Sequence, residues 1–550
     1  MRFSLYLLLL AALVLSVALA ACDQNKTEPA ASGPPGASEE KNAVPAPGDM
    51  LVGGSIGDAS SLLPALVSDS ASRDVTNLVY NGLVKVDENL NLVGDLAESW
   101  DVSPDGLALT FHLRKGVKWH DGAPFTARDA LFTYQLMIDP RTKTAYGEDF
   151  KQARKAEIID DHTFRVEYGR AFAPGLSSWS MEIMPEHLLA GVDLDETPLA
   201  RRPVGTGPYR FKEWETGRKI VLEANPDYFA GPPYLQRTVI RIIPDQAAMF
   251  LELKSGGLDL TALTPTQYVE EANSPEFAKN FKKYRYLQSA YTYLGFNLLD
   301  PKFQDRRVRQ AIALALDKEE IVKGVLLGLG APANGPYKPG TWQYNPDVKP
   351  YPFDQGRARE LLAEAGWKEQ DGVLARDGQP FEFTIITNQG NRNREMTALI
   401  IQQRLRELGI LVKIRTIEWA AFLKEFVDKK NFEAVILSWT IPPDPDPFDV
   451  WPSSKTRAGE LNFISYGNPE VDRLIDQGRY TFDQAERQKA YFRFQEILRE
   501  DVPCVFLYIP DALPVASSRI MGIKPAPAGI DYNRPRWFVP QNRQKYQARP

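Results

Sequence analysis

The chain has 550 residues, of which 43% are hydrophobic and 25% charged, and this composition excludes collagen, a coiled-coil rod, a polytopic membrane protein and a wholly disordered chain. At roughly 150 residues per domain, the length allows about three to four domains. The net charge of −6 argues against non-specific nucleic-acid binding, which needs basic surfaces. Four His and two Cys are a poor inventory for transition-metal sites or a disulfide framework.

The first 21 residues resemble a secretory signal, because an apolar run follows Arg2. The run closes with Leu19, Ala20, Ala21 and Cys22, which resembles the lipobox of bacterial lipoproteins. The resemblance implies that Cys22 becomes the first mature residue and is acylated. The alternative is an uncleaved transmembrane anchor, since about 18–20 apolar residues can span a bilayer. Either way, we expect the rest of the chain to lie outside the cytoplasm.

Residues 22–49 are rich in Pro, Ala, Ser and Glu and contain no aromatic residue. Such a segment buries too little apolar surface to offset its ordering entropy. We therefore expect a flexible tether here, followed by a folded body that begins at Met50.

The early part of the body predicts antiparallel strands. Residues 107–113 and 163–168 alternate in hydropathy, and turn residues such as Asp121 and Gly122 lie between them. We expect an α+β insert in this region.

The later part predicts alternating strands and helices. Residues 381–387 and 410–417 are β-rich, and residues 391–408 between them have helical spacing and end before Gly409. Strand, helix and strand in this order indicate a βαβ unit and an α/β layer. The same criteria predict a strand over 432–439 and helices over 305–326, over 354–365 and after Asp483. Asp354 is expected to cap its helix, and Asp483 with Glu486 three residues later resembles a capping box.

The sequence offers no recognisable catalytic constellation. It lacks the metalloprotease, nucleophile-elbow and Walker motifs, so we predict a protein that is not an enzyme and needs neither cofactor nor metal. The four histidines, His112, His120, His162 and His187, are scattered and predicted to be ordinary residues. The Gly-Thr-Gly of 205–207 indicates a tight turn rather than a phosphate cradle. Cys504 lies in an apolar run and is predicted to be a buried structural cysteine.

The region from Leu96 to Ala130 carries the most specific pattern. Residues 111–122 read FHLRKGVKWHDG, and this stretch closely resembles the signature of the bacterial extracellular solute-binding family 5, the oligopeptide-, dipeptide- and nickel-binding proteins of ABC importers. Further agreement is found at residues 204–209, 225–229, 293–297, 307–312 and 462–472. The resemblance runs from about Met50 to Phe538.

The family resemblance implies an α/β fold with an α+β insert, a two-lobe periplasmic-binding-protein clamp of type II. The implied lobe I comprises residues 50–292, with an inserted subdomain at about 88–200. The implied lobe II comprises 293–509, and residues 510–550 return to lobe I. Hinge crossings are expected near 290–297 and near 507–511.

The resemblance also implies a ligand held as an extended strand between the lobes. In lobe I the matching residues are Tyr80, Asn81 and Gly82. In lobe II they are Ser438, Trp439 and Thr440, with Trp439 either a wall beside the ligand or a core residue at a strand end.

One position departs from the family. Peptide-binding members usually carry an Asp three residues after this Trp, where it pairs with the ligand ammonium, and here that position is Pro442. Asp444 or Asp446 could serve instead, since a carboxylate suits a buried ammonium. The alternative is that both carboxylates cap turns in a Pro-rich loop, so recognition of a free N-terminus stays open.

The resemblance therefore implies a monomeric substrate-binding lipoprotein that delivers a peptide or peptide-like solute to the permease subunits of an ABC importer. It acts at the periplasmic or extracytoplasmic face, held to the membrane by the lipid anchor at Cys22 and without nucleic-acid partners. Two alternatives stay open: a ligand sensor on the same scaffold, and a binder of a non-peptide solute. Nickel is disfavoured without a His cluster, and a hydrolase is disfavoured without a nucleophile–base pair.

Overall fold

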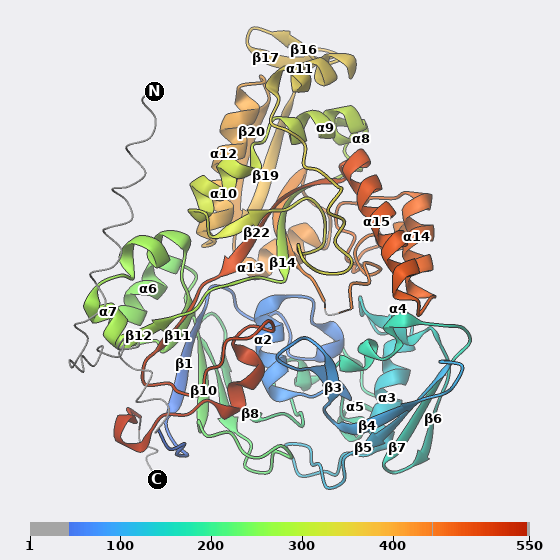
Figure 1. Cartoon of the computed structure of the whole chain (residues 1–550), viewed down its shortest axis with the longest axis vertical. Helices are drawn as coiled ribbons and strands as arrows, with labels where there is room; N and C mark the ends of the chain where they lie inside the picture. The colour runs from blue at the N-terminus through green and yellow to red at the C-terminus, as the bar shows by residue number, and fades with distance from the viewer. Residues whose placement is uncertain (1–42, 443, 547–550) are drawn as a thin grey trace, which may run out of the picture. The chain divides into compact units, whose positions relative to one another are not determined.

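The computed structural model describes residues 43–442 and 444–546, so the predicted signal and Cys22 lie outside the described residues. Two large mixed sheets organise the body from Met50 onward (Figure 1). The first sheet has the strand order β12 (Phe281–Lys283), β23 (Pro514–Ser517), β11 (Leu260–Ala262), β1 (Met50–Ser55), β10 (Arg237–Ile242), β9 (Lys219–Ala224) and β8 (Tyr209–Glu215).

The second sheet contains the predicted βαβ unit. Its order is β13 (Tyr286–Leu287), β22 (Cys504–Ala512), β14 (Ala290–Phe296), β21 (Ala434–Thr440), β19 (Glu382–Asn388) and β20 (Leu411–Ile417), and β15 (Gly330–Pro332) pairs with β22. Strand β19 runs parallel to both β20 and β21. The connecting helix α12 (Arg392–Arg406) starts after Asn391, whose side chain accepts a hydrogen bond from the Arg394 amide, so the βαβ prediction is confirmed.

The early strands form a smaller antiparallel sheet, as predicted. Its order is β4 (Ala97–Val102), β5 (Ala108–Leu113), β7 (Thr163–Tyr168) and β6 (Ala153–Asp160). Beside it lie α3 (Ala127–Ile138), α4 (Gly147–Phe150) and α5 (Glu186–Leu189), as Figure 1 shows. We call this region the insert, the first sheet with the insert lobe I, and the second sheet with its helices lobe II.

The chain passes from the first sheet to the second between Lys283 and Tyr286, and it returns between Ala512 and Pro514. These passages lie a few residues from the lobe boundaries expected from the sequence. Strand β14, where the first crossing was expected, pairs with β21 and β22 along its length and belongs to lobe II.

Asp49 was expected in the flexible tether, but it is buried in lobe I. Its carboxylate pairs with Arg519 and accepts the backbone amides of Lys545 and Tyr546. The folded body therefore includes this residue, because its charge is satisfied by the C-terminal segment.

The helix expected over residues 305–326 is two helices, α9 (Arg306–Leu314) and α10 (Lys318–Leu326). The prediction of one helix is wrong because the Asp317 side chain accepts a hydrogen bond from the Glu320 amide and so starts a new helix. The other lobe II helices are α8 (Pro301–Gln304), α11 (Gln355–Glu364), α13 (Trp419–Ala421), α14 (Pro469–Arg479) and α15 (Gln484–Asp501).

The expected helix caps at Asp354 and Asp483 are confirmed, because each side chain accepts a hydrogen bond from the first turn of its helix. The capping box expected at Asp483 is only half formed. The backbone amide of Asp483 donates a hydrogen bond to the Thr481 hydroxyl instead of to the Glu486 side chain.

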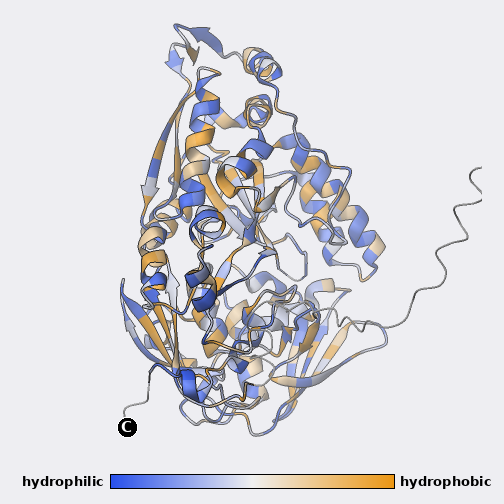
Figure 2. Ribbon diagram, turned by 60° about the vertical axis from the view of Figure 1, so that its left-hand side comes forward, coloured by the Kyte–Doolittle hydropathy of each residue, from blue (hydrophilic) through white to orange (hydrophobic). Residues whose placement is uncertain are grey.

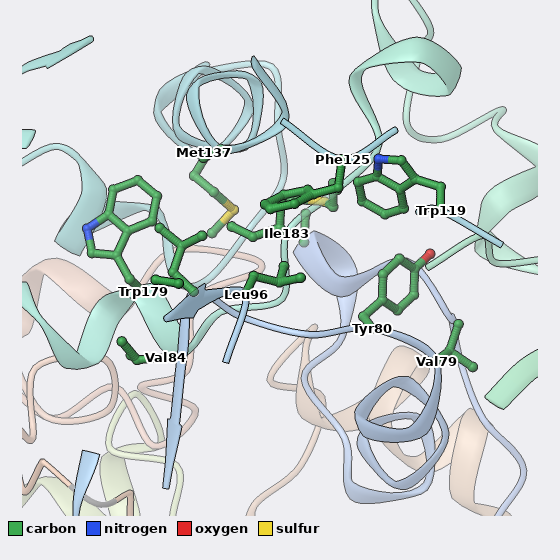
Figure 3. Close-up of a cluster of buried hydrophobic side chains, with 14 of the residues drawn as sticks. Val79, Tyr80, Val84, Leu96, Trp119, Phe125, Met137, Trp179 and Ile183 are labelled. Atoms are coloured by element: carbon green, nitrogen blue, oxygen red, sulfur yellow. The ribbon is translucent and has the colours of Figure 1, made fainter. Parts of the chain in front are cut away.

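One hydrophobic cluster of lobe I runs from strands β8 and β9 into the insert and includes Tyr80, Trp119 and Trp179, and two smaller clusters pack on the first sheet. Figure 3 shows part of this cluster, with side chains from several segments directed at one another. Lobe II has two clusters, one built around α9, α11 and α12 and the other around α14 and α15. In Figure 2 the helices alternate between hydrophobic and hydrophilic residues, as expected for helices that cover a core on one face.

The remaining helices and strands are short or peripheral. They are α2 (Ser70–Val79), α6 (Gln246–Lys254), α7 (Pro275–Asn280), β2 (Val84–Val86), β3 (Leu92–Gly94), β16 (Lys368–Gln370), β17 (Val373–Arg376) and β18 (Gln379–Pro380).

Candidate ligand-binding site

The predicted lobe I segment directly follows α2, and its side chains face inward. The ring of Tyr80 is only 2% exposed and lies in the core close to Trp119, as Figure 3 shows. Burial raises the pKa of the Tyr80 hydroxyl above its usual value. The Tyr80 side chain therefore stabilises lobe I.

Asn81 uses both ends of its amide inside lobe I. Its Nδ2 donates to Asp95 at 2.7 Å and to the Tyr228 hydroxyl at 3.3 Å, and its Oδ1 accepts from Thr206 at 3.1 Å. Gly82 is equally enclosed, since a Cβ there would lie 2.7 Å from the Ser180 carbonyl oxygen. These residues hold the end of α2 against the insert.

The Gly-Thr-Gly turn of 205–207 has a packing role. A Cβ on Gly205 would lie 1.9 Å from the Val79 carbonyl oxygen, and the Gly207 amide donates to that oxygen. The glycines allow close backbone approach to the end of α2, which agrees with the predicted turn rather than a phosphate cradle.

The predicted lobe II segment lies at the end of β21, and its side chains alternate between the two faces of the sheet. The Ser438 hydroxyl lies 2.9 Å from that of Thr292 on β14. Trp439 is partly exposed and stacks on Phe463 with ring centroids 5.3 Å apart. Thr440 ends the strand and is exposed.

Trp439 also lines a small aromatic pocket with Tyr291, Tyr293 and Trp451. The partial exposure of the indole fits the wall interpretation, and the stack on Phe463 fits the core interpretation. The role of Trp439 as a wall beside a ligand therefore stays a prediction.

Arg394 is a candidate site residue that the sequence did not single out. Its guanidinium donates to Asn388 at 2.7 Å and to Ser438 at 2.9 Å. Burial lowers its pKa, and no carboxylate in residues 43–442 and 444–546 forms an ion pair with it. Because a guanidinium has five donors, it can take a further acceptor beside Ser438. Its position in the first turn of an expected helix was the only sequence signal.

The two carboxylates of the Pro-rich loop have partners within lobe II. Asp444 pairs with Arg487 at 2.7 Å, and Asp446 lies 3.4 Å from Arg479. Asp444 also accepts from the Asp446 amide, and Asp446 accepts from the Phe448 amide. These contacts favour turn caps over a free ammonium site. Burial raises the pKa of Asp446 well above its usual range.

Two cations that lie beside this loop, Arg479 and Lys455, reach the insert of lobe I. Arg479 pairs with Asp149 of α4, and buried Lys455 donates to the Ala145 carbonyl at 3.2 Å. Asp449 lies 3.8 Å from Lys455, and burial raises the pKa of Asp449 to about 7. The loop of residues 444–452, which we call the bridging loop, contacts these two cations through Asp446 and Asp449 and therefore lies where the two lobes meet.

Two of the histidines have carboxylate partners. His112 and His187 lie 2.8 and 2.7 Å from Asp101 and Asp121. Cys504 is buried, as predicted, and burial raises its pKa.

In the described part of the chain, no group of three His, Cys, Asp or Glu side chains is arranged to hold a metal ion. None of the helices within residues 43–442 and 444–546 is long and apolar enough to cross a membrane.

Comparison with known proteins places this site in context. The model of the family "Bacterial extracellular solute-binding proteins, family 5 Middle" matches residues 91–460. The oligopeptide-binding protein AppA of Bacillus subtilis is 36% identical over 541 residues, covering 96% of this chain and 97% of that protein. Heme-binding protein A of Haemophilus influenzae is 31% identical over 501 residues, covering 85% of this chain and 88% of that protein.

Solved structures agree with the sequence comparison. The structure of AppA from Bacillus subtilis in complex with a nonapeptide superimposes with a TM-score of 0.86 at 35% identity, covering 90% of this chain and all of that one. The periplasmic binding protein DppA from Helicobacter pylori, in complex with the peptide STSA, gives a TM-score of 0.81 at 29% identity and covers 92% of this chain and all of that one. The fold is therefore a two-lobe α/β clamp with an insert in lobe I.

Proposed function

The chain belongs to family 5 of the bacterial extracellular solute-binding proteins, and from this premise we propose that it captures a peptide or peptide-like solute between its lobes and delivers it to the permease of an ABC importer. The observation that carries this proposal is the end-to-end similarity to AppA, a protein solved with a nonapeptide. A clamp of this kind binds by closing two lobes on its ligand.

Residues at the end of β21 supply the proposed lobe II contacts. Ser438 and Thr440 offer hydroxyls and strand backbone to an extended ligand, and Trp439 offers an aromatic wall. Arg394 adds donors for a carboxylate or carbonyl oxygen of the ligand, because its protein partners are neutral.

On the lobe I side, Tyr80, Asn81 and Gly82 are proposed to form a rigid wall of the site, since the Tyr80 and Asn81 side chains and the carbonyl oxygens of Asn81 and Gly82 are engaged inside lobe I. Asp444 and Asp446 can meet a ligand ammonium only in competition with Arg487 and Arg479. The proposed ligand is therefore held mainly by its backbone and by its acidic or carbonyl groups.

The test is direct identification of the bound solute. The body is purified without denaturation, the ligand is released by acid and then analysed by mass spectrometry. A set of peptides that rebinds in calorimetry supports the proposal. A single non-peptide solute that rebinds, with no binding of the peptides, would instead favour the second candidate, a binder of another solute, which the similarity to a heme-binding protein keeps in view.

We further propose that the protein is a lipoprotein anchored through Cys22, acting as a monomer outside the cytoplasm and without enzymatic activity. The Leu-Ala-Ala-Cys sequence at residues 19–22 supports the anchor. In Cys22→Ala, the protein should leave the membrane fraction. Retention in the membrane would mean that the apolar run itself is the anchor.

A further inference from the structure

We propose that Arg479 is a positioning residue that couples the bridging loop of lobe II to the insert of lobe I, so that ordering of the loop and closing of the lobes occur together. This inference rests on the proposed function for its purpose, but its physical core is a set of contacts between the lobes. The contacts come from four segments that are far apart in the sequence.

Arg479 ends helix α14, and its side chain has no exposed surface. Three groups surround the guanidinium. Asp149 of α4 pairs with it from lobe I, Asp446 of the bridging loop lies 3.4 Å away, and the ring of Phe448 lies 3.6 Å from it. One cation thus holds a carboxylate from each lobe and an aromatic ring of the loop.

Further contacts near Arg479 also join lobe II to lobe I. The Tyr480 hydroxyl donates to Gln152 of lobe I at 2.8 Å, and the guanidinium of Arg170 in lobe I lies 3.2 Å from the centre of the Tyr480 ring. The ring of Phe172, also in lobe I, lies 5.2 Å from Arg479. Lys455, just after the bridging loop, donates to the lobe I carbonyl of Ala145. In Figure 1, α4 lies directly beside the end of α14.

Burial makes this arrangement sensitive to separation of the lobes. A buried guanidinium is tolerated only when paired and hydrogen-bonded, and within the described residues the Nε and Nη1 of Arg479 have no hydrogen-bond acceptor. Loss of Asp149 would leave Asp446 and Phe448 as the remaining close partners of the cation. Opening of the lobes therefore removes the Asp149 counter-charge from Arg479 and weakens the support of the bridging loop.

The coupling has a direct consequence for binding. A ligand that orders the bridging loop also fixes Asp446 and Phe448 around Arg479, which favours the geometry in which Asp149 completes the site. Ligand binding at the loop then favours closure of the lobes, and closure favours ligand binding by the same free energy, as two-state coupling requires.

The experiment measures closure and loop order separately in the full chain. Fluorophores on the insert and on the β16–β17 turn report the closed fraction by single-molecule energy transfer, without ligand and with a pool of synthetic nonapeptides. Hydrogen–deuterium exchange reports the order of the bridging loop, residues 444–452. The test variant is Asp149→Asn, which keeps the size of the side chain. The control is Asp195→Asn, which breaks an exposed pair with Lys143 inside lobe I.

In Asp149→Asn, the ratio of closed to open molecules should fall about tenfold and exchange in the loop should rise, because a buried counter-charge is lost. Asp195→Asn should match the wild type. A second variant, Tyr480→Phe, should lower the ratio by about threefold, because it removes one hydrogen bond between the lobes.

An unchanged closed ratio in Asp149→Asn, or unchanged loop exchange despite a lower ratio, would overturn the coupling. The ligand-free measurement separates this outcome from failure of the proposed function, which would appear as absence of any peptide effect on the wild type. Melting curves of the three variants show whether each is folded at the temperature of the measurement.

Discussion

The two segments expected to face the ligand differ in how their polar groups are satisfied. In lobe I, both the Nδ2 and the Oδ1 of Asn81 form hydrogen bonds within the protein, and Tyr80 lies in the core. In lobe II, Ser438 lies beside the guanidinium of Arg394, which has neutral partners. We therefore propose that lobe I supplies a rigid wall and that lobe II supplies the charge that selects a ligand.

The largest expected effect comes from removing that charge. Arg394→Ala should lower the affinity for an acidic or carboxylate-bearing ligand by about 2–5 kcal/mol, because a charged hydrogen-bonded pair is lost. Calorimetry with the eluted solute measures it. Arg392→Ala on the same helix is the matched control, since Arg392 is exposed, and it should change the affinity by less than about 0.5 kcal/mol. Equal binding by both variants would remove Arg394 from the site.

Asn81→Ala tests the lobe I side. We expect the free energy of unfolding to fall by about 2–3 kcal/mol, because Asp95 and Thr206 lose a buried partner. The affinity of the folded fraction should stay unchanged. Denaturant unfolding and calorimetry measure the two quantities, and Asn77→Ala on the exposed face of α2 is the control. Normal stability with lost binding would show that the amide contacts the ligand.

His120 extends the comparison to pH. Its Nδ1 accepts from the Gly205 amide at 3.2 Å, and its Nε2 lies 3.0 Å from the Gly207 carbonyl, so the ring is neutral. Burial lowers its pKa to about 4. The unfolded chain, with a pKa of about 6.5, binds more protons between these values. Stability is therefore fully present above pH 6.5 and falls as the pH drops toward 4.

We expect the free energy of unfolding to fall by about 1–2 kcal/mol between pH 7.5 and pH 5, as measured by denaturant unfolding at both pH values. In His120→Gln this part of the pH dependence should disappear. His187→Gln, which removes a half-exposed histidine paired with Asp121, is the control. If the free energy of unfolding of His120→Gln still falls between pH 7.5 and pH 5 as in the wild type, the pH dependence belongs to other groups.

Local sequence signals predicted much of the fold. Strand alternation located β5 and β7, helical spacing located α12, and side-chain caps located the starts of α11 and α15. Periodicity missed the break at Asp317, because both halves share an apolar face and only the cap bond interrupts them.

The site was less accessible to sequence reasoning. Arg394 looks like an ordinary residue of a helical surface, and its burial depends on strands β19 and β21 that pack beside it. The partners of Asp444 and Asp446 lie 43 and 33 residues further along the chain, counted to Arg487 and Arg479. No local pattern specifies which charges meet at such a distance.

The smallest expected change in affinity concerns the carboxylates of the bridging loop. In Asp444→Asn the affinity should stay within about threefold of the wild type, since Arg487 and not the ligand is the partner of Asp444. Stability should fall by about 1 kcal/mol, because Arg487 keeps only a neutral acceptor. Asp347→Asn, at an exposed site in lobe II, controls for the loss of one negative charge. If affinity for a cationic peptide instead falls more than about thirtyfold, as expected for a paired charge, the ligand ammonium displaces Arg487 and lobe II selects charge at both ends of the ligand.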